Sequence, residues 1–299
     1  MTTNIQPLPA AEATGPTPQQ GTATKTEPTS TPASTRATMV KLEARGFTPV
    51  RHWFVQKHST LSPGDRKGIL ADLVTNKRSR ELNAYLALLM NYNQIVKHAD
   101  QPWPAAVWAR ALSSSETDPL PVASISRIWS NLNEHGLIDR SRVWKRALVI
   151  PRDESTKKVY TRPRPDLVPD AQKPYESYFI LPSAFWTERW HAELSLPGRA
   201  LLLIWLHETS ARDDSYLPYA KAEGWYGISA KTAERGIAEL IDNKLLVHTR
   251  KERVVADFSA TGWADHHYYA LTGPFSKAAR EQLQTQTKTE SEARASTDV

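Results

Sequence analysis

Hydroxyl and guanidinium side chains recur at one spacing in two segments of the chain. Ser124 precedes Arg127 by three residues, and Thr232 precedes Arg235 in the same way. An arginine can bind guanine O6 and N7 through two hydrogen bonds, while hydroxyl and amide groups reach other base edges. Further small polar or basic residues in the two segments are Ser126, Ser130, Asn131 and Lys231. The two segments are therefore candidates for contact with the bases of double-stranded DNA.

A cluster of basic residues follows each segment. The clusters are Arg140, Arg142, Lys145 and Arg146 in the first case, and Arg250, Lys251 and Arg253 in the second. Residues 137–164 hold nine Lys or Arg against three Asp or Glu, a net charge of +6, which equals the net charge of the whole chain. A local positive field of this kind suits a polyanionic partner. Trp144 stands inside the first cluster and is the aromatic residue to test as a DNA contact.

Apolar periodicity predicts a helix in each of the two segments. Ile125, Ile128, Trp129 and Leu132 recur at helical spacing and predict one buried stripe, with Arg127 on the opposite face. Gly136 then offers a left-handed residue beyond the helix end. In the second segment the expected stripe is Ala233, Ile237, Leu240 and Ile241. There Lys244 stands in the place of the glycine, and Asn243 could supply the left-handed turn instead.

The two segments belong to a longer repeat. An offset of 108 residues aligns Arg127 with Arg235 and Leu132 with Leu240 without a gap, and an offset near 116 aligns the upstream apolar helices. Each copy reads as a short strand, three helices and a β-hairpin, which indicates a domain duplication. The expected fold is α+β and mainly helical, with one domain over residues 45–150 and a second over 175–275.

The remaining segments are expected to lie outside a core. Residues 1–40 hold eleven Thr, six Pro and no aromatic residue, so that residues 1–44 are expected to be disordered. Prolines in residues 151–174 predict a stiff basic linker. Residues 276–299 are expected to form a disordered tail, in which 277–286 could continue a short helix.

The two copies resemble the winged helix-turn-helix superfamily. The pattern is a Ser or Thr that opens a helix, an Arg three residues on, a Leu five further, and a Gly-Leu-Ile exit into a hairpin. Ser124, Arg127, Leu132 and Gly136 follow it, and the second copy has Lys244 in place of the Gly and Leu246 in place of the Ile. The resemblance implies that the third helix of each copy enters the major groove, that the hairpin lies along the backbone, and that the partner is double-stranded DNA. Two such domains in tandem are similar in architecture to plasmid replication initiators. That architecture implies replication of a plasmid or mobile element, with replication or transcription machinery as further partners.

Other functions stay open at this point. A transcriptional repressor and a winged-helix scaffold that binds proteins are the alternatives. The acidic Glu234, Glu239 and Asp242 lie near the second reading face. Either this helix is tilted so that they miss the phosphates, or Glu239 accepts from a cytosine amine. The oligomeric state is open as well.

Several classes are disfavoured. Cysteine is absent, which excludes disulfides and thiolate chemistry. His266 and His267 alternate along a strand and are poor co-ligands, so no metal and no cofactor are expected. The chain has no glycine-rich phosphate loop and no Gly-x-Ser-x-Gly, so an enzyme is not expected. The longest apolar stretch has seven residues, and the N-terminus has no apolar signal segment, so we expect no membrane span and a cytoplasmic location on nucleoid or plasmid DNA.

Overall fold

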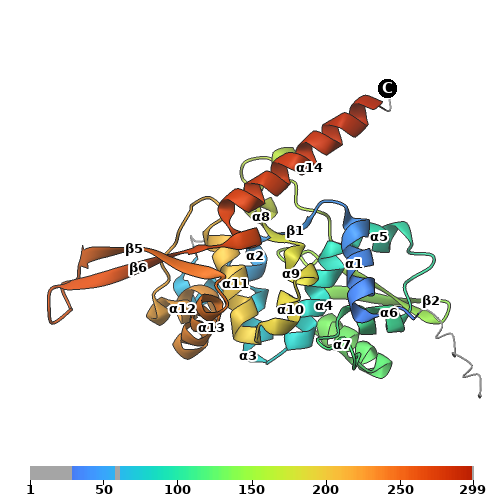
Figure 1. Ribbon diagram of the computed structural model, residues 1–299, viewed down its shortest axis with the longest axis horizontal. Coiled ribbons are helices and arrows are strands. Elements are labelled where there is room, and N and C mark those ends of the chain that lie inside the picture. Colours follow the sequence, from blue (N-terminus) through green and yellow to red (C-terminus); the bar gives the residue numbers. More distant parts are fainter. Residues whose placement is uncertain (1–28, 58–60, 298–299) are drawn as a thin grey trace, which may run out of the picture. The chain divides into compact units, whose positions relative to one another are not determined.

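The computed structural model describes residues 29–57 and 61–297, and these form an α+β fold in which helices dominate (Figure 1). The helices are α1 (Pro32–Glu43), α2 (His52–Val55), α3 (Ile69–Thr75), α4 (Ser79–Met90), α5 (Tyr92–Lys97), α6 (Ala105–Ala111), α7 (Val122–Glu134), α8 (Lys173–Glu176), α9 (Ala184–Thr187), α10 (Trp190–Glu193), α11 (Leu196–Glu208), α12 (Tyr219–Tyr226), α13 (Ala230–Asp242) and α14 (Lys277–Thr297). The strands are β1 (Phe47–Arg51), β2 (Ile138–Val143), β3 (Arg146–Pro151), β4 (Tyr178–Pro182), β5 (Leu246–Val255) and β6 (Trp263–Leu271). They form three two-stranded antiparallel sheets, β1–β4, β2–β3 and β5–β6.

Helices α7 and α13, which correspond to the third helix predicted for each copy, match in detail. Both α7 and α13 have thirteen residues, and their bounds differ by the offset of 108. After each helix a leucine N–H reaches back to the carbonyl of the leucine five residues earlier, from Leu137 to Leu132 at 3.0 Å and from Leu245 to Leu240 at 2.8 Å. This bond needs a left-handed residue just before the second leucine. Gly136 supplies it in the first half, as predicted, with φ 64°.

Two details of helix α13 differ from the expectation. Lys244 itself takes the left-handed turn at φ 57°, and Asn243 keeps φ −82°. The stripe of α13 buries Ala233, Ile237 and Leu240, but Ile241 is exposed. Its place in the contact with α11 is taken by Gly236, where an added Cβ would stand 2.7 Å from the Pro197 carbonyl oxygen. The closest approach of α13 to α11 therefore falls between Gly236 and the first turn of α11.

The expected division into two separate domains was wrong. Strand β1 of the first half pairs with β4 of the second, with Pro49 opposite Ile180 at the centre, so the two halves share one sheet. One core cluster includes Tyr85 of α4 and Trp205 of α11, and residues from Thr31 onward form one compact unit. Periodicity within each half could not reveal a strand pair between the halves.

The expected linker over residues 151–174 was also wrong in character, because part of it is buried. Tyr160 and Glu154 are buried, and Glu154 lies 3.1 Å from the guanidinium of Arg51 at the end of β1. Arg51 also meets Asp153 at 3.2 Å and Glu176, just before β4, at 3.0 Å. Burial alone lowers the pKa of Arg51, but the neighbouring carboxylates outweigh it and raise the pKa above its usual value. This ion cluster ties the segment to the β1–β4 sheet.

Both expected disordered ends contain helices. Residues 1–28 lie outside the described part of the chain, but α1 follows them, begins with a capping box at Thr31 and buries Met39 and Arg36. At the other end, α14 runs much further than the short helix expected. Its Arg280 is buried and donates to the carbonyl oxygens of Leu206, at 3.3 Å, and of Thr209, at 2.9 Å, beyond the end of α11. Helices α1 and α14 are thus parts of the fold. Within the described residues, no helix has the length and apolar character required to cross a membrane.

Candidate nucleic-acid interface

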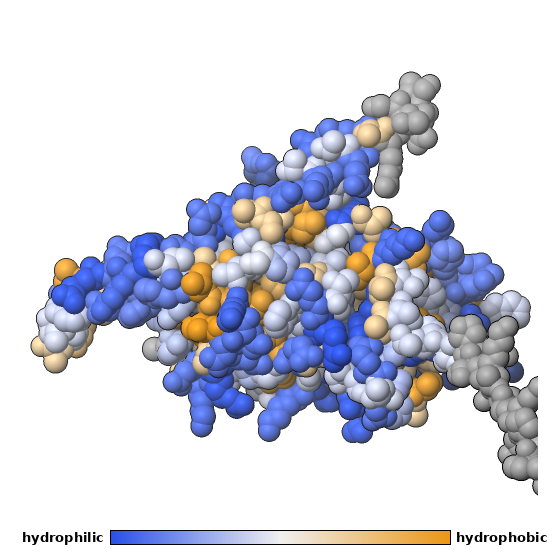
Figure 2. Space-filling view, viewed as in Figure 1, coloured by the Kyte–Doolittle hydropathy of each residue, from blue (hydrophilic) through white to orange (hydrophobic). Residues whose placement is uncertain are grey.

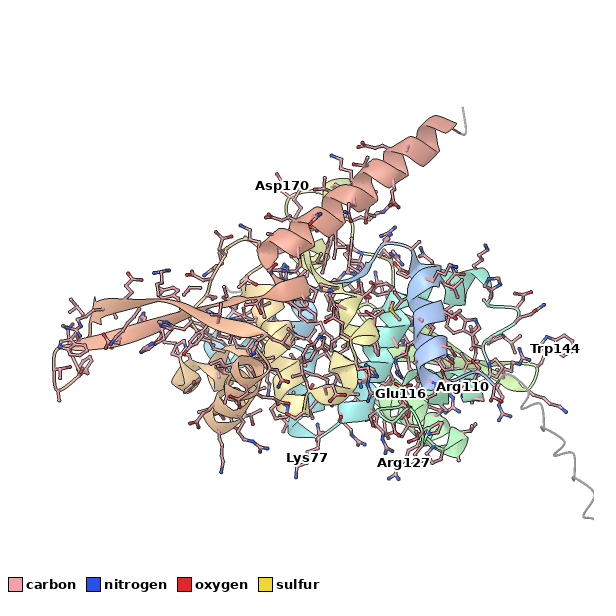
Figure 3. All side chains as sticks on the ribbon, in the orientation of Figure 1. Lys77, Arg110, Glu116, Arg127, Trp144 and Asp170 are labelled. Atoms are coloured by element: carbon pink, nitrogen blue, oxygen red, sulfur yellow. The ribbon has the colours of Figure 1, made fainter. Side chains whose placement is uncertain are left out.

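Arg127 lies on the exposed face of α7 (Figure 3). No described residue forms a hydrogen bond or ion pair with its guanidinium. The apolar stripe of α7 is buried as predicted, and Arg127 stands on the opposite face, free to meet a ligand. Sequence analysis therefore placed this side chain correctly on the surface.

A basic groove beside Arg127 was missed by sequence analysis. Lys77 and Arg78 lie just before α4 and Arg80 lies in its first turn, and all three line one groove with Arg127. Lys77 is held at φ 54° and exposed, and Arg80 is exposed as well. Glu81 is the single acid among the residues lining the groove, and it lies 3.7 Å from Arg78. The signal was the run Lys-Arg-Ser-Arg directly before an apolar helix.

The other predicted residues of α7 bind neighbours within the protein. Ser124 Oγ donates to the Pro121 carbonyl oxygen at 2.7 Å, and Asn131 Nδ2 donates to Glu81 Oε1 at 2.5 Å. Ser126 and Ser130 accept from the guanidinium of Arg140, at 2.9 and 3.0 Å. These residues therefore position α7 against α4 and β2, and Arg127 is left as its base-reading candidate.

The first turn of α7 has N–H groups that no side chain caps. Its N-cap residue is Pro121, which makes no side-chain hydrogen bond to the helix, and Val122 beside it is exposed. Unpaired N–H groups at a helix N-terminus favour phosphate oxygens. Helix α13 differs, because Ser229 caps it by accepting from the Thr232 N–H at 3.2 Å.

The β2–β3 hairpin presents an exposed cationic tip. Val143 pairs with Arg146, so that Trp144 and Lys145 form the turn, and Trp144 is 90% exposed (Figure 3). Its φ of 57° lies in the left-handed region, which is unfavourable for a bulky side chain. Arg142 and Lys145 are exposed and have no ion pair among the described residues, whereas Arg146 donates to the Pro102 carbonyl oxygen at 3.2 Å. The tip thus combines an exposed indole with free positive charge.

Helix α13 exposes a smaller basic face. Lys231 and Arg235 are exposed, without a hydrogen-bonding partner in the described part of the chain. Glu239 does not face a ligand: its Oε1 accepts from the Ser195 N–H at 2.6 Å, and its Oε2 accepts from the Ser195 hydroxyl. Glu239 therefore holds α13 against the start of α11, and its carboxylate is occupied by Ser195.

The basic residues of the β5–β6 hairpin are neutralised by partners. Arg250 lies 3.1 Å from Asp214 and 3.1 Å from Glu252, and its guanidinium stacks 3.4 Å from the centre of the Tyr268 ring. Lys251 and Arg253 both pair with Asp265. The far end of this hairpin instead exposes Val255 and Phe258, and apolar colour gathers there in Figure 2. The two hairpins are thus unlike in charge.

No protein-family model, curated protein or solved structure matches this chain. Among the described residues, no group of three or more His, Asp or Glu side chains could hold a metal ion.

Proposed function

We propose that the protein binds double-stranded DNA in a sequence-specific manner, with its first half as the main contact. Helix α7 would enter the major groove with Arg127 against base edges, while the β2–β3 hairpin follows the adjacent backbone. Helix α13 would enter a second major groove through Lys231 and Arg235. Each half would then act as a winged helix-turn-helix domain.

One observation carries the proposal: a set of unpaired cations gathers where α7 contacts the start of α4 and the β2–β3 hairpin. Arg127, Lys77 and Arg80 flank the groove beside α7, and Arg142 and Lys145 stand on the hairpin that Arg140 ties to the same helix. A cation that already pairs with a carboxylate in the protein gains less binding free energy from contact with a phosphate. Free cations beside an uncapped helix N-terminus are suited to a phosphate backbone.

The arrangement of elements supports the winged-helix interpretation. In the first half α7 contacts α4, α6 and β2, and in the second half α13 contacts α11, α12 and β5. In both halves the third helix buries its apolar stripe and exposes its arginine. This is the geometry by which a recognition helix can protrude from a three-helix unit.

Two reading helices on one chain favour an initiator of plasmid or mobile-element replication, which grips a long asymmetric site. A repressor that uses one helix per chain in a dimer is the second candidate. The exposed Val255 and Phe258 on the neutral hairpin favour the third, a scaffold in which this hairpin binds a protein.

Selection of bound duplexes from a random library tests the proposal. A recovered asymmetric motif of about 20 base pairs supports two engaged helices, at about one helical turn each. A palindrome bound by two chains supports the repressor. Recovery of no motif, together with no binding to mixed duplex at low salt, contradicts DNA binding altogether.

A further inference from the structure

A cavity of about 530 Å³ lies away from the proposed DNA interface, between α2, the end of α11 and α12. Its size falls within the range of small-molecule sites, roughly 300–1,000 Å³. His52 and Trp53 contribute from α2, His207 and Glu208 from α11, and Trp225 from α12. The two halves of the chain therefore build this cavity together.

Positive charge dominates the polar part of the cavity. Lys57, Arg66 and Arg212 line it. The backbone N–H of Lys57 donates to the Arg66 carbonyl oxygen at 2.6 Å, and Arg66 Nε donates to the Leu61 carbonyl oxygen at 2.7 Å. Glu208 is the single acid in the lining, and its carboxylate already accepts from the hydroxyls of Tyr226 and, at 3.0 Å, Ser215. Three cations therefore line the cavity together with one carboxylate that has its own donors, which suits an anionic ligand.

Flat aromatic surfaces form the other part of the lining. Trp53, Tyr216 and Trp225 face the cavity. Gln56 Nε2 donates to the Trp225 carbonyl oxygen at 3.2 Å and fixes α12 against α2, while the Tyr216 ring stacks on His266 at 3.9 Å between centres. Aromatic faces of this kind stack against planar heterocycles such as nucleobases.

Two neutral histidines lie in the cavity wall. His52 Nδ1 and His207 Nδ1 are 2.7 Å apart, so one ring must donate and the other accept. Burial lowers the pKa of His52 to about 3 and of His207 to about 4, so neither ring is charged at neutral pH. His207 Nε2 lies 4.0 Å from Glu208 Oε1. The histidines thus add polar groups without adding charge.

We propose that this cavity binds a nucleoside phosphate, with the base against Trp53 and Trp225 and the phosphate against Lys57, Arg66 and Arg212. Aromatic and cationic side chains in one lining match the two chemically different ends of such a ligand. This binding does not depend on the proposed contact with DNA.

Isothermal titration of the full chain with ADP, adenosine and inorganic pyrophosphate, at pH 7.5, tests the assignment. We expect ADP to bind at least tenfold more tightly than either part, with GDP, CDP and UDP as a panel for the base. Absence of heat from all four nucleotides overturns the proposal. Pyrophosphate that binds as tightly as ADP also overturns it, because the cavity is then only an anion site.

Arg212→Ala is the matched variant, since Arg212 is exposed and its loss should leave the fold intact. It should weaken the binding of ADP by about tenfold. Lys97→Ala, which removes an exposed cation on α5, should leave the affinity for ADP unchanged. Equal ADP affinities of the two variants contradict the site. If a saturating duplex abolishes ADP binding and Arg212→Ala also lowers the salt dependence of DNA binding, the cavity belongs to DNA and the proposal fails.

Discussion

Arg140 of β2 donates to Ser126 Oγ of α7 at 2.9 Å, and so fixes the hairpin to the helix. The guanidinium also reaches Ser130 Oγ at 3.0 Å. The charge of Arg140 is thus directed toward the protein, and Arg142 and Lys145 are the residues of the hairpin that remain for phosphate. A residue that counts as a DNA contact by composition is in this case a positioning residue.

The two hairpins should respond differently to removal of charge. Replacement of Arg142 and Lys145 by Ala should lower the slope of log K against log salt by about two units, because each phosphate contact contributes about 0.9. Replacement of Lys251 and Arg253 by Ala should change the slope little, since both cations pair with Asp265. Fluorescence anisotropy of a labelled duplex from 50 to 300 mM salt measures both. Equal slopes for the two double variants would show that the carboxylate pairing does not decide which hairpin binds.

Arg127→Ala should cost about 1–3 kcal/mol on the selected duplex and relax the preference at one base position. The reason is that a bidentate contact to guanine is lost while the phosphate contacts remain. Competition between the selected duplex and its single-base variants measures the effect. A loss that is the same for every sequence would place Arg127 on a phosphate, and Lys97→Ala serves as the neutral control.

Trp144→Gly should raise stability and weaken DNA binding at the same time. A left-handed backbone costs an L-residue about 1–2 kcal/mol, and glycine avoids much of this cost, so the free energy of unfolding should rise by up to about 1 kcal/mol. Denaturant unfolding followed by circular dichroism measures the first effect, and anisotropy the second. Unchanged DNA binding would mean that the exposed indole has no role in the complex.

Acid should destabilise the protein through its buried histidines. Burial lowers the pKa of His52 to about 3 and of His207 to about 4, below the ordinary value of 6.5. The unfolded chain therefore binds more protons than the folded chain between these values, and stability falls as the pH drops below 6.5. Each of the two histidines should lower the free energy of unfolding by about 2 kcal/mol at pH 5 relative to pH 7.

Thermal unfolding from pH 7.5 to 5 checks this loss. His207→Gln should flatten the pH profile, whereas His98→Gln, at an exposed position, should leave it as it is. A profile that His207→Gln does not change would assign the acid sensitivity to other groups.

Gly236→Ala should destabilise the contact between α13 and α11. A methyl group at this position would stand 2.7 Å from the Pro197 carbonyl oxygen and 2.8 Å from Leu201 Cδ2. The clash should cost about 1–3 kcal/mol and outweigh the higher helix propensity of alanine. Gly64→Ala is the matched control, since nothing lies within 4 Å of its added methyl group. Equal unfolding free energies for both variants would show that α13 can shift without cost.

Local patterns predicted the helices, and contacts across the chain explain what they missed. The stripe of Ile125, Ile128, Trp129 and Leu132 specified both the helix and its buried face, so Arg127 could be placed on the surface from the sequence. The buried state of the expected linker could not be inferred in this way, because it depends on Arg51, whose partner Glu154 is 103 residues away.

The candidate site shows the same limit. Composition counts Arg250 as a free cation, but Asp214, 36 residues earlier, neutralises it through a hydrogen bond that no local pattern indicates. In contrast, Lys77 and Arg80 were within reach, since a basic run just before an apolar helix is visible in the sequence. These two residues could have been selected by their position at the start of an apolar helix, in addition to their charge.

In the part of the chain that the structure describes, β1 and β4 form a two-stranded antiparallel sheet, so each half contributes one strand to it. The distance between α7 and α13 is consequently fixed by the packed core between the two halves and not by a flexible linker. A DNA target with five base pairs inserted at its middle, half a helical turn, would turn one of its two grooves away. The chain could then engage one groove but not both.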